Sequence, residues 1–232
     1  MSQDVSRRNF LRAAGVTAAS ASALSAMSVA AATPDQKIRI LGISTSERLG
    51  KTTATAIQAS LDAAVATAPD RIEAELIELA AYEIPGYVAA GVPLKPGHRD
   101  DFPQVAEKLS ATNVGGLIIG TPVYFSNMSS LCKAFLERLG QFRKAYTFSG
   151  KPAGVLAVGG CRNGGQELTL QTVHATLLCH EMLIVGEGRP TGHFGGTLWN
   201  NAKDDILKDE FGIQTAQNLG RRIAGIVNKQ EG

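Results

Sequence analysis

The strongest constraint on the fold is an alternation of short apolar runs with stretches of helical period, which continues from Lys37 to the C-terminus. Short apolar runs bounded by turn residues are typical of buried strands, and apolar residues three or four apart indicate amphipathic helices. Five units of a strand followed by a helix can be traced in this way. Such an alternation predicts a parallel sheet with helices packed on its faces.

The polarity of the predicted strands indicates their order in the sheet. Residues 116–120 and 153–158 carry no polar side chain and are expected at the centre, whereas 72–79 interleaves Glu73, Glu75 and Glu78 and is expected at an edge. The remaining strands are expected at 37–43 and 183–185. We therefore predict an α/β fold with a doubly wound, five-stranded parallel sheet of order 2-1-3-4-5.

The predicted helices are defined by their apolar stripes. The first is expected at about 52–68, and the second follows Asp100 and Asp101, which are expected to cap it. The inward-facing residues of the second to fifth helices are expected to be Phe102, Val105, Ala106 and Leu109; Leu131, Phe135, Leu139 and Phe142; Leu170, Val173, Leu177 and Leu178, in a helix at about 166–180; and Leu219, Ile223 and Ile226, in a helix at about 208–227. The connection 80–99 is long for a compact domain, which favours a functional or mobile loop.

The N-terminus has the features of an export signal. Arg7 and Arg8 are followed by Phe10, Leu11 and Arg12, and then by a stretch of small and weakly apolar residues to Ala32. We interpret residues 1–32 as a twin-arginine (Tat) signal peptide and residues 33–232 as the exported domain, so that the Tat translocase is a transient partner and the periplasm the destination. A membrane helix is the alternative, but alanine and serine make the stretch only weakly hydrophobic. Because the Tat route carries folded proteins, the signal also hints at a bound cofactor.

Charge and cysteine content exclude several classes of function. The formal net charge of +2 includes Arg7, Arg8 and Arg12, so residues 33–232 are close to neutral, and there is no basic run with interleaved aromatics. Nucleic acid is therefore not an expected partner. The three cysteines are too few and too scattered to predict a disulfide framework or a metal site, although one pair could form in an oxidising compartment.

In a sheet of this order, ligands bind outside the carboxyl ends of the strands, so the loops after strands one, three and four are the candidate site. The first of these loops, 44–53, holds five hydroxyl side chains and Arg48 directly before a helix. Hydroxyls and free N–H groups at a helix N-terminus suit a phosphate dianion. Gly50-Lys51-Thr52 resembles the end of a Walker loop, but Thr45 stands where that motif requires its first glycine.

The other two loops favour a flat ligand. The loop 120–129 places Tyr124 and Phe125 outside the predicted strand, where they can lie against a ring; alternatively, Pro122 only turns the chain and the aromatics cap the core. The loop 159–167 has four glycines within 159–165, which favours close approach of the backbone to a ligand, with a flexible surface turn as the alternative.

These three segments, Gly42–Arg48, Gly120–Phe125 and Gly159–Glu167, give the chain its resemblance to the NADPH-dependent FMN reductase family, and especially to its iron-sulfur flavoproteins. The resemblance implies a flavodoxin-like fold, non-covalent FMN, NAD(P)H as a possible electron donor, and a homodimer or homotetramer. By position it implies that Ser44, Ser46, Arg48, Thr52 and Thr53 hold the FMN phosphate. It also implies that the isoalloxazine ring is bordered by Pro122, Val123, Tyr124, Phe125, Ser126, Gly159, Gly160, Asn163, Gly164 and Gly165.

The chain departs from the iron-sulfur relatives in one segment. Those proteins carry a cysteine cluster beside an Ile-Pro-Gly sequence after the second strand, whereas here 84–90 reads IPGYVAA and contains no cysteine. An iron-sulfur cluster cannot be ligated by this segment. We expect the long loop to serve instead as a lid or an oligomer contact.

The expected function is an exported oxidoreductase that passes electrons through FMN to a small acceptor, such as a quinone, a flavin or a metal species. No catalytic side chain is required, because the flavin carries the chemistry. His193 can approach the flavin from the side or be merely solvent-exposed, and Cys161 is either a redox thiol or a small filler. The alternatives are a flavodoxin-type electron carrier that docks to a protein, which the near-neutral charge disfavours, and a chain that has lost FMN. Since free NADPH is not expected in the periplasm, the donor there can be another partner.

Overall fold

The sheet has the predicted order in a computed structural model that describes residues 36–200 and 203–230. The predicted signal peptide, 1–32, lies outside the described residues. The strands are β1 (Ile38–Ser44), β2 (Ile72–Glu78), β3 (Val114–Pro122), β4 (Pro152–Gly159), β5 (Leu183–Ile184) and β6 (Gly196–Trp199). They form one six-stranded sheet with the path β2-β1-β3-β4-β5, in which β6 also pairs with β4. All pairings are parallel, which confirms the doubly wound architecture.

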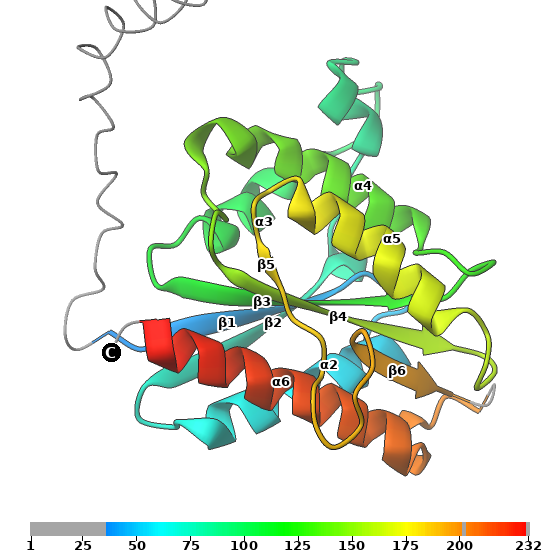
Figure 1. Ribbon diagram of the computed structural model, residues 1–232. Helices are drawn as coiled ribbons and strands as arrows, with labels where there is room; N and C mark the ends of the chain where they lie inside the picture. The colour runs from blue at the N-terminus through cyan, green and yellow to red at the C-terminus, as the bar shows by residue number, and fades with distance from the viewer. Residues whose placement is uncertain (1–35, 201–202, 231–232) are drawn as a thin grey trace, which may run out of the picture. The chain divides into compact units, whose positions relative to one another are not determined.

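Helices cover both faces of this sheet, as Figure 1 shows. The α-helices are α2 (Thr52–Thr67), α3 (Phe102–Leu109), α4 (Ser130–Arg138), α5 (Gln166–Leu178) and α6 (Glu210–Gln230). Short 3₁₀ helices are η1 (Leu79–Ala81), η2 (Gly86–Ala90), η3 (Leu139–Ala145) and η4 (Ile206–Lys208). One apolar cluster joins α3, α4 and α5 to one face of the sheet, and a second joins α2 and α6 to the other. Crossover helices on both faces are what a parallel sheet requires.

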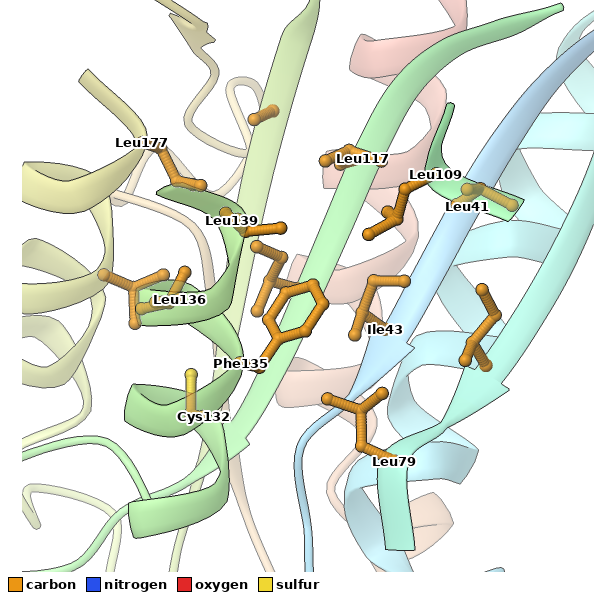
Figure 2. Packing of buried hydrophobic residues seen from close by; sticks show 14 of the residues in the cluster. Leu41, Ile43, Leu79, Leu109, Leu117, Cys132, Phe135, Leu136, Leu139 and Leu177 are labelled. Carbon is orange, nitrogen blue, oxygen red and sulfur yellow. The ribbon is translucent and has the colours of Figure 1, made fainter. Parts of the chain in front are cut away.

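The predicted apolar stripes form the core. In the cluster drawn in Figure 2, Phe135 of α4 lies between the side chains of β1 and β3, with Leu109 of α3 nearby. The four predicted stripe residues of α3 are all buried, as are the four of α4 and η3. The strands β3 and β4 are central and apolar, and β2 is the edge strand, as predicted. Hydrophobic periodicity therefore positioned both faces of the sheet correctly.

The fifth strand position is occupied by two short strands, which corrects part of the sequence prediction. β5 pairs with the start of β4 at Pro152 and Ala153, and β6 pairs with Leu156 to Gly159 at its end. The chain leaves the sheet between them, over residues 185–195. The strand β6, at Gly196–Trp199, is not among the predicted strands. Pairing with β4 supplies the stability that the local sequence does not indicate.

Two details of the helices also differ from expectation. Leu178 was expected inside, but it is 59% exposed, because α5 ends at this residue and its last turn faces solvent. The side chain of Asp101 makes no capping bond in α3, since its Oδ2 accepts from the backbone N–H of Glu83 at 2.9 Å. The cap comes from Asp100, whose Oδ1 accepts from the N–H of Phe102 at 3.2 Å.

The long connection after β2 is held by polar contacts. The Glu83 carboxylate binds His98 Nδ1 at 2.7 Å and accepts from the backbone N–H of Arg99 at 3.0 Å. Arg138 of α4 forms two 2.8 Å bonds to Asp100 and lies over the ring of Phe102. Within the described residues, no helix is both long and apolar enough to cross a membrane.

Candidate functional site

The loops after β1, β3 and β4 meet at the carboxyl edge of the sheet. Their strands are neighbours in the order β1-β3-β4, so the loops must emerge side by side. The backbone N–H and the hydroxyl of Thr45 both donate to the carbonyl oxygen of Gly120, at 2.9 and 2.8 Å. Ser129 Oγ donates to the Thr45 carbonyl at 2.7 Å while accepting from the N–H of Cys132, and so joins the first loop to the start of α4.

The loop after β1 leaves the N-terminus of α2 without a side-chain cap. Lys51 is the N-cap residue and makes no capping bond, and the first turn of α2 contains no acidic residue. Thr52 and Thr53 are buried there, and Ser44 and Ser46 are buried at the start of the loop. An uncapped helix N-terminus flanked by hydroxyls has N–H donors available for an anion.

Two carboxylates shape the same loop. Glu78, the last residue of β2, accepts from the N–H of Gly50 at 2.7 Å. Arg48, predicted to be a phosphate ligand, forms an ion pair with Asp204 at 2.7 Å, with both side chains partly exposed. The arginine is therefore at the predicted edge of the sheet but already has an acidic partner, which an incoming anion would have to share or replace.

The loop after β3 is a tight turn in a strained conformation. Tyr124 and Asn127 exchange two backbone hydrogen bonds, and the residues between them, Phe125 and Ser126, have φ angles of 52° and 59°. Two consecutive positive φ values define a turn that normally uses Asn-Gly, and for other residues each costs on the order of 1 kcal/mol. Phe125 is fully exposed at its tip. Backbone strain that presents an aromatic ring to solvent points to a functional role.

The glycine loop after β4 is packed directly against that turn. A Cβ on Gly165 would lie 2.3 Å from Ser126 Oγ, and the φ angle of Gly165 is +92°. Only glycine fits both the conformation and the space. The second and third predicted loops are thus in contact, with Gly165 and Ser126 at the point where they touch. The other predicted residues of the two loops, Pro122, Val123, Gly159, Gly160, Asn163 and Gly164, lie along the same edge.

Gln166 organises the glycine loop from within, a role that the sequence did not reveal. Its side-chain nitrogen donates to the carbonyl oxygens of Cys161 and Leu198, at 2.6 and 3.2 Å, and its Oε1 accepts from the N–H of Gly164 at 2.8 Å. The residue is buried. A glutamine directly after a glycine run, at the start of a predicted helix, is the only signal that could have suggested it.

The glycine loop is also held by Trp199 and Asp209, which lie far along the chain and were not predicted from the sequence. The carboxylate of Asp209 accepts from the backbone N–H groups of Trp199 and Gly212, at 2.7 and 3.0 Å, and forms an ion pair with Arg162 of the glycine loop. The indole N–H of Trp199 donates to the carbonyl of Gly160 at 2.9 Å. Nothing near Trp199 or Asp209 in the sequence indicates this partnership.

His193 is held by a residue outside the three loops. Its Nδ1 lies 2.6 Å from Glu187 Oε1, and its backbone N–H donates to the same oxygen at 2.8 Å. Its ring meets Phe211 edge-on, with the centroids 5.9 Å apart. The described contacts therefore join His193 to the segment between β5 and β6 and to α6, and none joins it to the three predicted loops.

The cysteines differ in their surroundings. Cys132 is buried at the start of α4, and burial raises the pKa of its thiol to about 11, so it stays protonated at neutral pH. Cys161 and Cys179 are exposed and free. Among the described residues, no group of three or more His, Cys, Asp or Glu side chains is arranged to hold a metal ion.

Comparison with known proteins agrees with this geometry. Residues 38–195 match the family model described as NADPH-dependent FMN reductase, which spans all three loops. The chain is 35% identical over 193 residues to an iron-sulfur flavoprotein of Methanocaldococcus jannaschii, covering 82% of this chain and 97% of that protein. It is 29% identical over 168 residues to an NAD(P)H dehydrogenase (quinone) of Archaeoglobus fulgidus, covering 72% and 83% of the two chains.

A solved structure supports the fold. The crystal structure of a flavodoxin, WrbA-like protein from Agrobacterium tumefaciens superimposes with a TM-score of 0.56 at 17% identity, covering 84% of this chain and 99% of the other. The flavodoxin-like architecture implied by the family resemblance is thereby confirmed. The family model matches residues 38–195, and the Methanocaldococcus jannaschii relative is 35% identical over 97% of its own length. The chain therefore belongs to the NADPH-dependent FMN reductase family.

Proposed function

We propose that this protein is an exported FMN-dependent oxidoreductase that takes electrons from a donor such as NAD(P)H and delivers them to a small acceptor, such as a quinone, a flavin or a metal species. Membership of the family makes it an FMN-dependent oxidoreductase. Bound FMN would supply the redox chemistry, and the protein would supply binding, orientation and control of access. The export step and the identity of the acceptor are the finer parts of the proposal.

The phosphate of FMN fits the loop after β1. Ser44, Ser46, Thr52 and Thr53 are buried in the loop that leads into the uncapped N-terminus of α2, and the helix dipole favours an anion at that position. Arg48 would add a guanidinium donor at the rim if it turned from Asp204 toward the phosphate. These hydroxyls and this guanidinium support the proposal that the phosphate dianion binds at this loop.

The ring of FMN fits the edge formed by the turn 124–127 and the glycine loop 159–165. The small residues there leave the backbone accessible, and Gln166 and Asp209 fix its course from behind. A rigid backbone with few side chains in front of it suits a flat, polar ring system. The observation that carries the proposal is this contact between the two loops at Gly165 and Ser126, beside the uncapped N-terminus of α2.

The first test is a visible absorption spectrum of the protein after expression in the cytoplasm. We expect a flavin spectrum, and a cofactor that is released on denaturation and identified as FMN by chromatography. If no flavin is present and none binds when FMN is added, the proposal fails. Arg48→Ala should weaken FMN binding, and an unchanged affinity would place the phosphate elsewhere.

The donor and acceptor are tested separately. Relatives named as NAD(P)H dehydrogenase (quinone) support a nicotinamide donor and a quinone acceptor. Stopped-flow reduction of the FMN-loaded protein by NADPH, NADH and other reductants, followed by reoxidation with a quinone, ferric chelates or free FMN, would rank the candidates. A protein that none of these reductants reduces would favour the electron-carrier alternative.

Export is proposed from the sequence of residues 1–32 alone and is tested in cells. Fractionation should recover the protein, with its flavin, in the periplasm, and replacing Arg7 and Arg8 with lysine should retain it in the cytoplasm. Periplasmic recovery that is unaffected by both substitutions would argue against the Tat route. A homodimer or homotetramer remains part of the proposal, for which the exposed Tyr124 and Phe125 are candidate contacts, and sedimentation analysis would measure the assembly state.

A further inference from the structure

An open hollow of about 420 Å³, rich in arginine, lies between the middle of α6 and the segment that joins β5 to β6. We call it the arginine hollow; its residues are Glu187, Gly188, Arg189, Asn218, Arg221 and Arg222. In Figure 1 the segment after β5 runs across α6 before it returns to the sheet as β6. The hydrogen bond from Asn218 Nδ2 to Thr191 Oγ1, 2.9 Å long, joins the two walls.

The guanidinium groups of the hollow have no acidic partners. None of Arg189, Arg221 and Arg222 forms an ion pair with a carboxylate of the described residues, whereas Arg39, Arg48, Arg99, Arg138 and Arg162 all do. The one carboxylate in the lining, Glu187, directs Oε1 to His193 instead. Three guanidinium charges and one carboxylate leave a net local charge of +2, which matches a dianion.

Glu187 does not compete with a ligand for the arginines of the hollow. Its side chain is 0% exposed, and its Oε2 is buried without a hydrogen-bond partner among the described residues. The arginine donors therefore face no accessible carboxylate in the lining, and they select an anion with several acceptor oxygens, such as a phosphate group.

The hollow is already formed in the unliganded protein. Arg222 lies against the backbone of Gly188, whose φ angle of +75° and lack of a Cβ permit the contact, because an added Cβ would be 2.9 Å from Arg222 Nη1. Asn218 is buried, and its Oδ1 accepts from Arg221 Nη1 at 2.8 Å, which orients that guanidinium. Groups that are already oriented lose less entropy when they bind a ligand.

The hollow is separate from the proposed FMN site. Gly212, whose N–H binds Asp209 behind the glycine loop, is in the first turn of α6, and Asn218 to Arg222 lie six to ten residues further on. At 1.5 Å per residue, this places the hollow about 9–15 Å along the helix from that end of the site. The phosphate of FMN is assigned to a different loop, so the hollow requires a ligand of its own.

We propose that the arginine hollow binds a phosphate ester, either a phosphorylated small molecule or the headgroup of a phosphoglycerol lipid. Arginine forks pair with phosphate oxygens in a bidentate manner, which favours phosphate over a simple halide or a neutral sugar. The proposal does not depend on FMN binding, because none of its residues belongs to the three loops.

The test distinguishes the two possible sources of the phosphate ester, a soluble molecule and a lipid. The protein is loaded with FMN and free FMN is then removed, so that the β1–α2 loop is already occupied while no free phosphate ester competes for the hollow, and low salt limits charge screening. Calorimetry measures the binding of glycerol 3-phosphate and of inorganic phosphate. Co-sedimentation measures binding to vesicles of phosphatidylglycerol, with phosphatidylcholine vesicles as the neutral reference. The variants are Arg221→Gln with Arg222→Gln in one chain, and Arg71→Gln as the control. Arg71 is another arginine without an acidic partner among the described residues, and it contacts the Asn228 carbonyl instead.

We expect saturable binding in at least one arm, weakened about tenfold or more in the double variant and unchanged in Arg71→Gln. Binding of glycerol 3-phosphate alone identifies a soluble ligand, and binding of anionic vesicles alone identifies a lipid headgroup. Absence of binding in both arms, or equal loss in the double variant and the control, overturns the proposal. Since Arg221 and Arg222 are exposed, the double variant should fold, and its thermal unfolding checks this.

Discussion

The two sides of the proposed FMN site are built in opposite ways. On the ring side, the turn 124–127 and the glycine loop 159–165 are tied to the protein by Gln166, Trp199 and Asp209, and they touch each other at Gly165. On the phosphate side, the N-terminus of α2 has no side-chain cap, and within the described residues no hydrogen bond occupies the hydroxyls of Thr52 and Thr53. The ring side is therefore held by hydrogen bonds that are already formed, whereas the hydroxyls of Thr52 and Thr53 on the phosphate side remain available as donors.

This difference separates two ways in which a substitution can harm the protein. A change on the ring side should disturb the folded state itself, and cofactor binding only as a consequence. A change on the phosphate side should leave the folded state intact and weaken the cofactor. Measuring unfolding and binding on the same variants therefore tests whether the two sides differ as the contacts indicate.

The largest effect is expected from Gly165→Ala. The new Cβ would meet Ser126 at 2.3 Å, in a backbone conformation that alanine rarely adopts, so the two ring-side loops would have to separate. We expect a loss of about 2–4 kcal/mol in the free energy of unfolding, and FMN affinity lowered by about tenfold or more. Urea unfolding and FMN titration measure the two quantities.

Gly160→Ala is the matched control for that variant, because a Cβ at Gly160 has no atom within 4 Å. Its unfolding free energy should change by no more than about 0.5 kcal/mol. If the two alanine variants behave alike, the glycine loop is not locked against the turn, and the comparison between the two sides fails.

The next effect should come from Asp209→Ala, which removes the shared partner of Trp199, Gly212 and Arg162. Two backbone N–H donors, that of Gly212 buried and that of Trp199 partly buried, would lose their acceptor, at a cost of about 2 kcal/mol or more in stability. The control is Asp205→Ala, whose exposed pair with Lys208 is expected to contribute less than about 0.5 kcal/mol. Thermal unfolding of both variants compares a supporting carboxylate with a surface one.

The sequence could indicate the role of Gly165 but not that of Asp209. Gly165 belongs to a run of glycines that indicates close backbone approach, and the strand order predicted from polarity already places that run beside 120–129. The physical basis is local, since apolar periodicity determines the elements and parallel strands bring their carboxyl ends to one edge.

The role of Asp209 could not be predicted in the same way. Trp199 and Arg162 are ten or more residues away in the sequence, and hydrophobic periodicity carries no information about contacts between such distant residues. The same limit explains β6, where four residues beginning with a glycine become a strand only through pairing with β4. It also explains Arg48, whose neighbour Asp204 is brought close by the fold alone. Pairings between distant segments are tertiary information, and side-chain type predicts them poorly.

A smaller effect, confined to binding, is expected on the phosphate side from Thr52→Val. Valine keeps the shape and removes the hydroxyl, so the unfolding free energy should stay within about 0.5 kcal/mol of wild type while FMN affinity falls about tenfold. Riboflavin lacks the phosphate, and its affinity should not change. Thr55→Val, one turn further along α2, removes a hydroxyl that already binds the Lys51 carbonyl and should leave both affinities as they are. An equal loss for riboflavin would show that Thr52 acts on the ring side.

The smallest effect is expected from the ion pair between Arg138 and Asp100, which belongs to neither side of the site. It tests whether the site depends on the packing of the helices around it. The Arg138 guanidinium beside Asp100 lowers the pKa of that carboxyl, with a further contribution from the N–H of Phe102, although burial opposes the shift. A carboxyl with a lowered pKa in the folded state stabilises the protein above its ordinary pKa, and this contribution is lost as the pH falls through the lowered value. Asp100→Asn should therefore flatten the decline in unfolding free energy between about pH 5 and pH 3, by less than about 1 kcal/mol because the Asp100 side chain is partly exposed. FMN affinity at neutral pH should not change in this variant, since Asp100 contacts α4 and α3 and none of the three loops. A weakened affinity would mean that the packing of α3 against α4 sets the position of the loops, and that the ring side is not fixed by Gln166 and Asp209 alone.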